Sequence, residues 1–227
     1  MSKSELRIIN DIIEFSKSNQ ENIFISVNKS NIFDVDALIV GPKNTPYFGG
    51  FYFFKLIFPK SYPNHPPHVT FLTTDGFVRF NPNLYADGKV CLSILGTWTG
   101  PGWTPVMTLT SVLLSIESLL SENPIVNEPG YDNIKSDNIK AITYYNYILY
   151  YNYKISIHDV LNDKFKKLSD KFKQPITNKI LKNKEILNND LLTYKQILDN
   201  FPLLQENKIY FMNYKLSHLD FKSIDLI

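Results

Sequence analysis

The sequence predicts an α+β fold: an N-terminal helix, a four-stranded antiparallel meander, a long functional loop and further helices. Three observations lead to this prediction. Apolar residues near the start recur at helical spacing, four β-prone runs separated by turn signals follow, and a second apolar stripe at helical spacing lies beyond residue 108. Successive strands joined by short turns pair as antiparallel neighbours, whereas parallel strands need long crossover connections.

The predicted N-terminal helix begins after Ser2 and runs to about Lys17. Ser2 and Glu5 have the spacing of a capping box, in which each side chain accepts a hydrogen bond from a free backbone N–H group at the helix start. The residues that follow at helical spacing are Leu6, Ile9, Ile12 and Ile13. These apolar positions predict an amphipathic helix.

The four β-prone runs cover residues 24–27, 34–40, 51–58 and 69–72. The third run is rich in aromatic residues, which favour strands. Gly41-Pro42 and Gly49-Gly50 are turn signals on either side of the loop before it. Because prolines fix the backbone and remove donors, the proline-rich segment 62–67 is expected to be irregular.

Residues 73–108 form a long segment with little periodicity, and loops of this length inside a compact domain are usually functional or disordered. This segment is too apolar for a solvated linker. A clear helix follows it, capped by Thr108 or Thr110 and ending near Asn123-Pro124. Its stripe is expected to pack in the core and consists of Leu109, Val112, Leu113, Ile116, Leu119 and Leu120.

The composition changes after Tyr131, where prolines become rare and Lys, Asn, Ile and Leu dominate. Residues 139–153 are predicted to be helical, as are 164–173 and 180–200, with Pro175 and Pro202 as interruptions. We divide the chain into a domain of residues 1–154 and a mainly helical C-terminal extension of residues 155–227. The lysines of this extension are interpreted as a solvated helix face.

The totals exclude several classes of protein. With 44% hydrophobic and 20% charged residues, the 227-residue chain has the balance of a folded soluble protein. A net charge of +2 is too small to indicate a nucleic-acid partner. No apolar run reaches the ~18 residues of a membrane span, and the first residues lack the core of a signal peptide. We therefore expect no membrane partner and a cytoplasmic location, with the nucleus as a second compartment.

Cys91 is the one cysteine of the chain, so neither an internal disulfide nor a cysteine-rich zinc site is expected. A lone cysteine is most often a small buried hydrophobe. Here, however, the turn signal Asp87-Gly88 precedes it, and Asn83 lies eight positions earlier. If the chain loops back at this turn, the thiol and the amide face one point. An Asn amide can stabilise an oxyanion in acyl transfer, or it can hold the loop that positions the thiol.

A cysteine hydrolase needs a histidine base beside its thiol. The four histidines lie at positions 65, 68, 158 and 218, outside the stretch 81–95. The lack of a dedicated base in this stretch suits an enzyme that protects a thioester from water until an amine arrives.

The motifs of the chain resemble those of ubiquitin-conjugating enzymes from the N-terminal helix to about Lys154. Their joint order and spacing carry the resemblance. In order they are Gly41-Pro42, Thr45-Pro46-Tyr47, Gly49-Gly50-Phe51-Tyr52-Phe53, Phe58-Pro59, Tyr62-Pro63, Pro66-Pro67-His68-Val69, Asn81-Pro82-Asn83, Gly88-Lys89-Val90-Cys91-Leu92, Trp103-Thr104-Pro105 and Ser111-Val112-Leu113-Leu114-Ser115-Ile116.

The resemblance implies that residues 1–154 are a ubiquitin-conjugating catalytic domain. It makes Cys91 the residue that accepts ubiquitin, or a ubiquitin-like modifier, as a thioester from an activating enzyme, and Asn83 the active-site asparagine. The modifier then passes to target lysines, directly or with a ligase. No bound cofactor or metal is expected, because the activating enzyme consumes the ATP upstream.

The chain departs from the usual family pattern in two places that resemble a larger, atypical subgroup. Asn81 stands where the family usually has histidine, and we expect it to support the active-site loop, since Asn also donates and accepts hydrogen bonds. An insertion around residues 96–102 lengthens the spacing between Cys91 and Trp103. Within it, Trp98 is expected to be packed rather than to contact a ligand.

The acidic or serine gate of the family falls in residues 122–129, which match poorly. Glu128 is our choice for a group that orients or deprotonates the attacking amine, and Asn127 is its competitor. An acid at the surface end of a helix is an equally good interpretation of Glu128.

The resemblance also implies partner surfaces. Lys3 and Arg7 match basic positions of the first helix that meet the activating enzyme. Asn64, Pro105 and Val106 match loops that ligases contact. Asn64 is polar where the family often has Phe, which argues against a ligase of the thioester-forming type.

Three rivals remain: a non-catalytic ubiquitin-binding relative, which would lack the cysteine; a hydrolase that removes the modifier; and an interaction protein that acts through its extension. The carrier hypothesis expects the Cys91 sulfur to be accessible in the long loop, with the amide of Asn83 close by.

Overall fold

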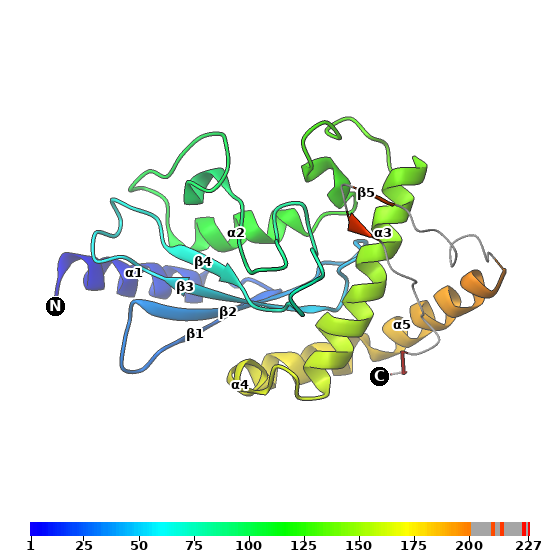
Figure 1. Ribbon diagram of the computed structural model, residues 1–227. Coiled ribbons are helices and arrows are strands. Elements are labelled where there is room, and N and C mark those ends of the chain that lie inside the picture. The colour runs from blue at the N-terminus through cyan, green and yellow to red at the C-terminus, as the bar shows by residue number, and fades with distance from the viewer. Residues whose placement is uncertain (201–209, 212–213, 216–223, 226) are drawn as a thin grey trace.

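The computed structural model describes residues 1–200, 210–211, 214–215, 224–225 and 227 (Figure 1). Helix α1 spans Lys3–Lys17 and is followed by strands β1 (Ile23–Val27), β2 (Asp34–Val40), β3 (Phe51–Ile57) and β4 (His68–Phe71). These strands form one sheet in the order β1-β2-β3-β4, and each pairs antiparallel with the next. The predicted helix and meander are confirmed.

The start of α1 is fixed by the predicted capping box. The Ser2 hydroxyl accepts a hydrogen bond from the N–H of Glu5 at 3.1 Å, and the Glu5 carboxylate accepts one from the N–H of Ser2 at 2.5 Å. The buried face, however, is centred on Ile8, Asp11 and Phe15, and Leu6 and Ile13 are exposed. The buried face of α1 is therefore offset from the predicted apolar stripe, because the Asp11 carboxylate occupies part of the face that meets the core.

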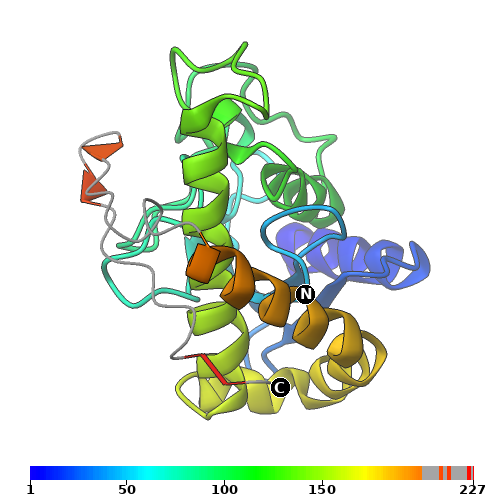
Figure 2. The same cartoon turned by 90° about the vertical axis from the view of Figure 1, so that its right-hand side faces the viewer.

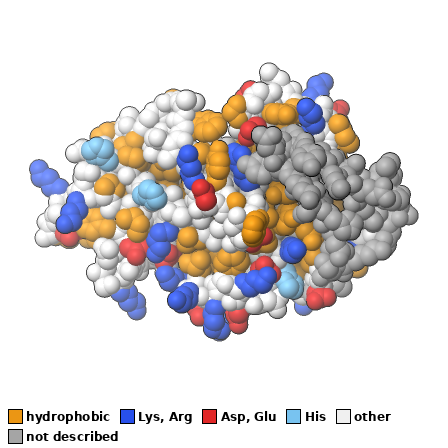
Figure 3. All heavy atoms as spheres, viewed as in Figure 1, with side chains coloured by type: hydrophobic (Ala, Val, Ile, Leu, Met, Phe, Trp, Pro, Cys, Tyr) orange, Lys and Arg blue, Asp and Glu red, His pale blue; other side chains and the backbone are white. Residues whose placement is uncertain are grey.

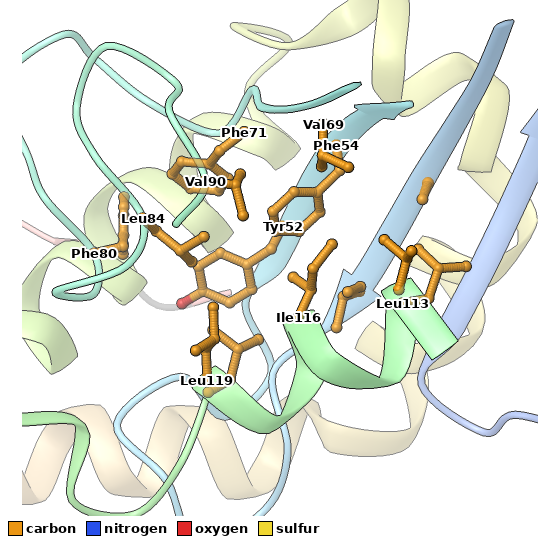
Figure 4. Close-up of a cluster of buried hydrophobic side chains, with 14 of the residues drawn as sticks. Tyr52, Phe54, Val69, Phe71, Phe80, Leu84, Val90, Leu113, Ile116 and Leu119 are labelled. Atoms are coloured by element: carbon orange, nitrogen blue, oxygen red, sulfur yellow. The ribbon is translucent and has the colours of Figure 1, made fainter. Parts of the chain in front are cut away.

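Helix α2 (Leu109–Leu119) begins at Thr108, whose hydroxyl accepts from the N–H of Ser111. Its apolar stripe is buried, as predicted. Figure 4 shows this stripe against one face of the sheet, with Tyr52 and Phe54 of β3 on the sheet side. Side chains from the long loop, among them Val90, complete this main core.

Both faces of the central strands are buried, which explains the continuous apolar run of β3. Alternate residues point to opposite faces. Tyr52 and Phe54 belong to the main core, whereas Phe51 and Phe53 pack with side chains of the C-terminal segments. The members contributed by those segments are Val160, Phe172 and Ile176.

The C-terminal part is mainly helical. Helix α3 (Ile139–Tyr151) continues as the π-helix η3 (Asn152–Asp159); α4 (Lys166–Ser169), the 3-10 turn η4 (Asp170–Phe172) and α5 (Lys173–Asn200) follow. Figure 2 shows α5 crossing the lower part of the molecule in front of α3, with α1 and α2 to one side. Two short strands, β5 (Tyr210–Phe211) and β6 (Tyr214–Lys215), pair beyond it.

The proposed division between residues 154 and 155 stays a prediction, and this point lies within η3. Pro175 does not interrupt a helix: it lies in the first turn of α5, where a missing N–H group is tolerated. Pro202 lies outside the described residues.

Three lysines of the extension form ion pairs with residues of β2 and of the loop before β1, so the interpretation of these lysines as a solvated helix face is incomplete. Lys171 pairs with the buried Asp36 of β2, which also binds Lys55 at 2.7 Å. Lys182 and Lys179 reach Glu21 at 2.9 and 3.6 Å. Figure 3 shows basic and acidic side chains interspersed along the lower edge of the molecule, in the same view as Figure 1. No described helix is both long and apolar enough to span a bilayer.

The contact between the extension and the sheet yields a stability prediction. Phe172 is buried and stacks on Phe53, with ring centroids 6.0 Å apart. Phe172→Ala should lower the free energy of unfolding by about 3–5 kcal/mol, as for other buried aromatic truncations. Denaturant unfolding of the full chain measures this loss. Leu181→Ala, at an exposed position of α5, should stay within about 0.5 kcal/mol. A loss below about 1 kcal/mol for Phe172→Ala would show that the contact of Phe172 with Phe53 does not stabilise the fold as expected.

Candidate active site

Cys91 lies directly after a bridged segment of the long loop and before the 3-10 turn η1 (Ser93–Leu95). Asn83 forms hydrogen bonds with both the N–H group and the carbonyl oxygen of Cys91. The Cys91 N–H donates to the Asn83 carbonyl oxygen at 2.9 Å, and the Asn83 Nδ2 donates to the Cys91 carbonyl oxygen at 2.6 Å. The chain therefore loops back as the sequence suggested and fixes Cys91 from two sides.

The turn at Asp87-Gly88 allows this return. Gly88 has φ +93°, and a Cβ atom there would lie 2.9 Å from the carbonyl oxygen of Phe71. Only glycine combines that backbone conformation with so close an approach. The Asp87 carboxylate caps the turn by accepting from the N–H of Lys89 at 3.0 Å.

The thiol of Cys91 is free but buried, with 1% of the residue exposed. The expectation of an accessible sulfur is therefore wrong for this conformation. The amide of Asn83 is close, as expected, but it binds the backbone of Cys91. Its Oδ1 is buried and has no hydrogen-bond partner among the described residues.

The turn after Cys91 closes on the residues that flank it. The Thr97 hydroxyl donates to the Val90 carbonyl oxygen at 2.7 Å, and its Oγ1 accepts a hydrogen bond from the N–H of Leu92 at 2.9 Å. The Thr97 N–H also donates to the Leu92 carbonyl oxygen at 3.2 Å. The insertion is exposed, so the hydroxyl and N–H groups of one residue, Thr97, connect an exposed loop to both sequence neighbours of Cys91.

Asn81 is fully buried, and its amide joins four segments. Its Nδ2 donates to the Tyr47 hydroxyl at 3.0 Å and to the Leu119 carbonyl oxygen at the end of α2 at 2.8 Å. Its Oδ1 accepts from the N–H of Asn83 at 2.9 Å and from Asn127 at 3.4 Å. These contacts are those expected of a residue that supports the loop.

Tyr47 extends this network. Its hydroxyl donates to the Phe80 carbonyl oxygen at 2.8 Å while it accepts from Asn81. Complete burial raises the pKa of Tyr47 far above its usual value, so the hydroxyl remains neutral and able to donate.

The two gate candidates have different neighbours. Asn127 ends the 3-10 helix η2 (Pro124–Asn127) and points its amide toward Asn81 and the Leu119 carbonyl oxygen. Glu128 follows it and forms an ion pair with Arg79 at 3.6 Å. Arg79 in turn donates to the Pro82 carbonyl oxygen.

Arg79 was not singled out from the sequence, although it links Glu128 to the active-site loop. Its guanidinium carbon also lies 3.9 Å above the ring of Tyr85, a cation–π contact. The sequence places Arg79 just before the Asn81 motif, but no periodic pattern there indicates which residues it contacts.

The residues predicted to meet partners lie close together. Arg7 donates to the carbonyl oxygens of Pro105 and Met107 at 2.9 and 2.7 Å, so α1 and the loop before α2 are joined. Lys3 is exposed, and Val106 is 84% exposed. Asn64 is exposed next to Pro63, whose carbonyl oxygen accepts from the indole N–H of Trp103 at 2.6 Å.

Asp11 underlies this surface and was also missed. Its buried carboxylate accepts from Arg7 at 2.8 Å, from the N–H of Leu109 at 3.1 Å, and from the Tyr62 hydroxyl. An acid three positions after Ile8, on the buried side of a helix, is the sequence signal that could have identified it.

Trp98, in the insertion after Cys91, is 37% exposed, so the expectation that it is packed was wrong.

No hydrogen bond joins Cys91 to a histidine among the described residues. His65 contacts Ser61, His158 contacts Asp159, and His68 is exposed on β4, whereas His218 lies outside the described part. The described residues also contain no cluster of three or more His, Cys, Asp or Glu side chains that could hold a metal ion.

Residues 7–147 match the sequence model of a family described as "Ubiquitin-conjugating enzyme". The chain is 52% identical over 128 residues to ubiquitin-conjugating enzyme E2 Z of Xenopus tropicalis, a match that covers 56% of this chain and 41% of that protein. It is 39% identical over 193 residues to the probable ubiquitin-conjugating enzyme protein 17 of Caenorhabditis elegans, covering 81% of this chain and 26% of that one. The chain thus spans less than half the length of these relatives.

Among solved structures, a putative ubiquitin-conjugating enzyme from Plasmodium yoelii superposes with a TM-score of 0.54 at 25% identity. The superposition covers 69% of this chain and 97% of that one. The resemblance stated from the motifs, and the fold that it implies, are therefore confirmed.

The buried amide of Asn81 predicts a large stability effect. Asn81→Ala removes the 2.8 Å donor to the Leu119 carbonyl oxygen and the acceptor of the Asn83 N–H group, and should cost about 2–4 kcal/mol of unfolding free energy. Asn81→His, which keeps a ring donor, should cost less. Asn64→Ala, at an exposed asparagine, is the matched control. Equal melting temperatures for the Ala variants at 81 and 64 would contradict the supporting role.

The tie made by Thr97 predicts a change in thiol reactivity. Thr97→Val keeps the shape but removes the hydroxyl, and losing a bond of about 1–1.5 kcal/mol should raise the open population roughly tenfold. The rate of Cys91 modification by a chromogenic disulfide measures this directly, because the chain has no other thiol. Thr99→Val, in the exposed part of the same insertion, should leave the rate unchanged. An unchanged rate for Thr97→Val would mean that this turn does not shield the sulfur.

Proposed function

This chain belongs to the ubiquitin-conjugating enzyme family, and we propose that Cys91 carries ubiquitin, or a ubiquitin-like modifier, as a thioester between an activating enzyme and a target amine. The observation that carries this proposal is the position of the only thiol. It lies at the place that the family motif gives to the acceptor cysteine, and Asn83 fixes its backbone by two hydrogen bonds.

The first step is an exchange between thioesters. The Cys91 thiolate attacks the carbonyl carbon of the thioester that joins the modifier to the activating enzyme. A new C–S bond forms at Cys91, and the thiolate of the activating enzyme leaves with the electron pair of the broken C–S bond. Neither an oxidant nor a reductant takes part. The ATP that drives the pathway is consumed upstream by the activating enzyme, and this step requires no bound cofactor.

In the second step, the lone pair of a target lysine amine attacks the carbonyl carbon of the Cys91 thioester. The nitrogen loses a proton, an amide C–N bond forms, and Cys91 leaves as thiolate. Glu128 is our candidate to orient the amine or take its proton. Its ion pair with Arg79 links it to the Pro82 carbonyl oxygen, and so to the loop that holds Cys91.

Asn83 acts in this proposal mainly as a positioning residue. Its Nδ2 is engaged by the Cys91 carbonyl oxygen, which supports the alternative in which the amide holds the loop. Its remaining N–H proton is the one that could face a tetrahedral intermediate.

Because Cys91 is buried, the proposal requires its surroundings to open before the thioester forms, and the turn that follows Cys91 is our candidate for the part that moves. The hydroxyl of Thr97 ties the exposed insertion to Val90 and Leu92, and its N–H group binds the Leu92 carbonyl oxygen, so opening of this turn breaks these bonds. We propose that docking of the activating enzyme or of the modifier loosens this turn. The closed form would then keep the thiol from other acyl donors between cycles.

The partner surface of the proposal combines α1 with two loops. Lys3 and Arg7 would meet the activating enzyme, and Asn64, Pro105 and Val106 would meet a ligase. Lys3, Asn64, Pro105 and Val106 are exposed, and Arg7 binds the carbonyl oxygen of Pro105, which supports a shared docking region. The hydrolase alternative receives no support from a described histidine beside Cys91.

A charging assay tests the proposal. The full chain, an activating enzyme, ATP and ubiquitin should give an adduct that a reducing agent cleaves. Cys91→Ser should give an oxygen ester that resists the reducing agent, and Cys91→Ala should give no adduct, because no other thiol is present. Ubiquitin-like modifiers run in parallel identify the cargo.

Gel electrophoresis with and without reducing agent separates the outcomes. An adduct that persists in Cys91→Ala, or cleavage of ubiquitin conjugates without ATP, would refute the carrier role.

A further inference from the structure

A cavity of about 390 Å³, away from the active-site loop, lies where the loop before β3 meets the two long C-terminal helical segments. The loop contributes Lys43 and Phe48 to its wall. This cavity does not include Cys91, Asn83 or Glu128, and no step proposed above uses it.

The helical walls of the cavity present two regular faces. Tyr145, Leu149 and Tyr153 recur every four residues along α3 and η3. Ile186, Asp190 and Tyr194 recur with the same spacing along α5. Residues four apart share one side of a helix, so each helix directs one face into the cavity. The hydroxyl of Tyr153 donates to the carbonyl oxygen of Leu187 at 3.0 Å and fixes the two helices together.

Asp190 is the one acidic residue of the cavity wall. Burial raises its pKa, and no cation forms an ion pair with it among the residues that the structure describes. Its negative charge also contributes to raising the pKa values of Tyr145, Tyr153 and Tyr194. One carboxylate therefore lies close enough to influence three aromatic hydroxyls, and it has no described counter-ion.

We propose that this cavity binds an alkylammonium group, with Asp190 as its counter-ion and the rings of Phe48, Tyr145 and Tyr194 around it. Aromatic rings attract cations through their negative faces, and a carboxylate among aromatic rings is the arrangement that selects ammonium and methylated ammonium groups. An anionic ligand would be repelled by Asp190, and a neutral apolar ligand would cover that partly buried carboxylate without compensating its charge.

Lys43 is the alternative cation to be tested. It lies on the cavity wall, but its side chain is exposed and forms no ion pair with Asp190 among the described contacts. A ligand ammonium can therefore reach the carboxylate without displacing a described partner.

The test is a calorimetric titration of the full chain at pH 7 with three probes: Nα-acetyl-Nε-trimethyllysine amide, tetramethylammonium chloride, and the neutral tert-butyl isostere of the first. Both ammonium probes should bind at least about tenfold more tightly than the neutral isostere, because only they carry the charge. Tighter binding of the lysine probe than of tetramethylammonium identifies a protein side chain as the source of the ammonium. Equal binding identifies a small ammonium compound.

Asp190→Asn should weaken both ammonium probes by about tenfold or more, and Glu185→Gln is its matched control. Glu185 is an exposed carboxylate of the same helix, outside the cavity, so its removal changes the net charge equally and should not alter binding. Because burial raises the folded-state pKa of Asp190, ionisation above that pKa destabilises the fold. Asp190→Asn should therefore melt no lower than the parent at pH 7, which keeps the variant interpretable.

Three results would overturn this proposal: equal affinity for the charged and neutral probes, unchanged ammonium binding in Asp190→Asn, or binding that occurs only in Lys43→Ala. The last result would show that Lys43 fills the site. None of these outcomes depends on charging of Cys91, so this inference stands or falls separately from the carrier function.

Discussion

One buried side-chain amide organises the active-site region. Asn81 uses both of its donors and its acceptor oxygen, and each contact ends on a different segment: the loop of Tyr47, the end of α2, the backbone of Asn83 and the helix η2. A buried polar group without partners costs more than one bond contributes, so this arrangement tolerates few alternatives. The position of Asn83, and through it the backbone of Cys91, follows from this constraint.

The local elements were predictable because their signals are local. The capping box of Ser2 and Glu5, the turn at Asp87-Gly88 and the aromatic-rich run of β3 each involve residues near one another in sequence. The loop-back that brings Asn83 to Cys91 follows from that turn. The burial of the thiol does not, because no pattern near Cys91 in the sequence indicates how the loop packs around it. Asp11 and Arg79 were missed because part of their bonding is to distant segments: Asp11 accepts from Tyr62 and Leu109, and Arg79 pairs with Glu128.

The C-terminal segments form part of the structural core. Phe51 and Phe53 point away from the main core and are covered by Phe172 and Ile176, and the buried Asp36 is neutralised by Lys55 and Lys171. A sheet with one bare aromatic face would expose a large apolar patch, so the covering helices stabilise the domain as well as extend it. The continuity of α3 with η3 shows how the chain passes from one role to the other.

The side chain of Arg7 has a consequence for the order of binding events. Its two outer nitrogens are occupied by the carbonyl oxygens of Pro105 and Met107, while its inner nitrogen binds Asp11. A protein that competes for this guanidinium must detach the loop that carries Val106. Binding at the α1 surface and the conformation of that loop are therefore coupled. A protein that takes the Arg7 guanidinium and a protein that needs the loop in its present conformation would bind one after the other.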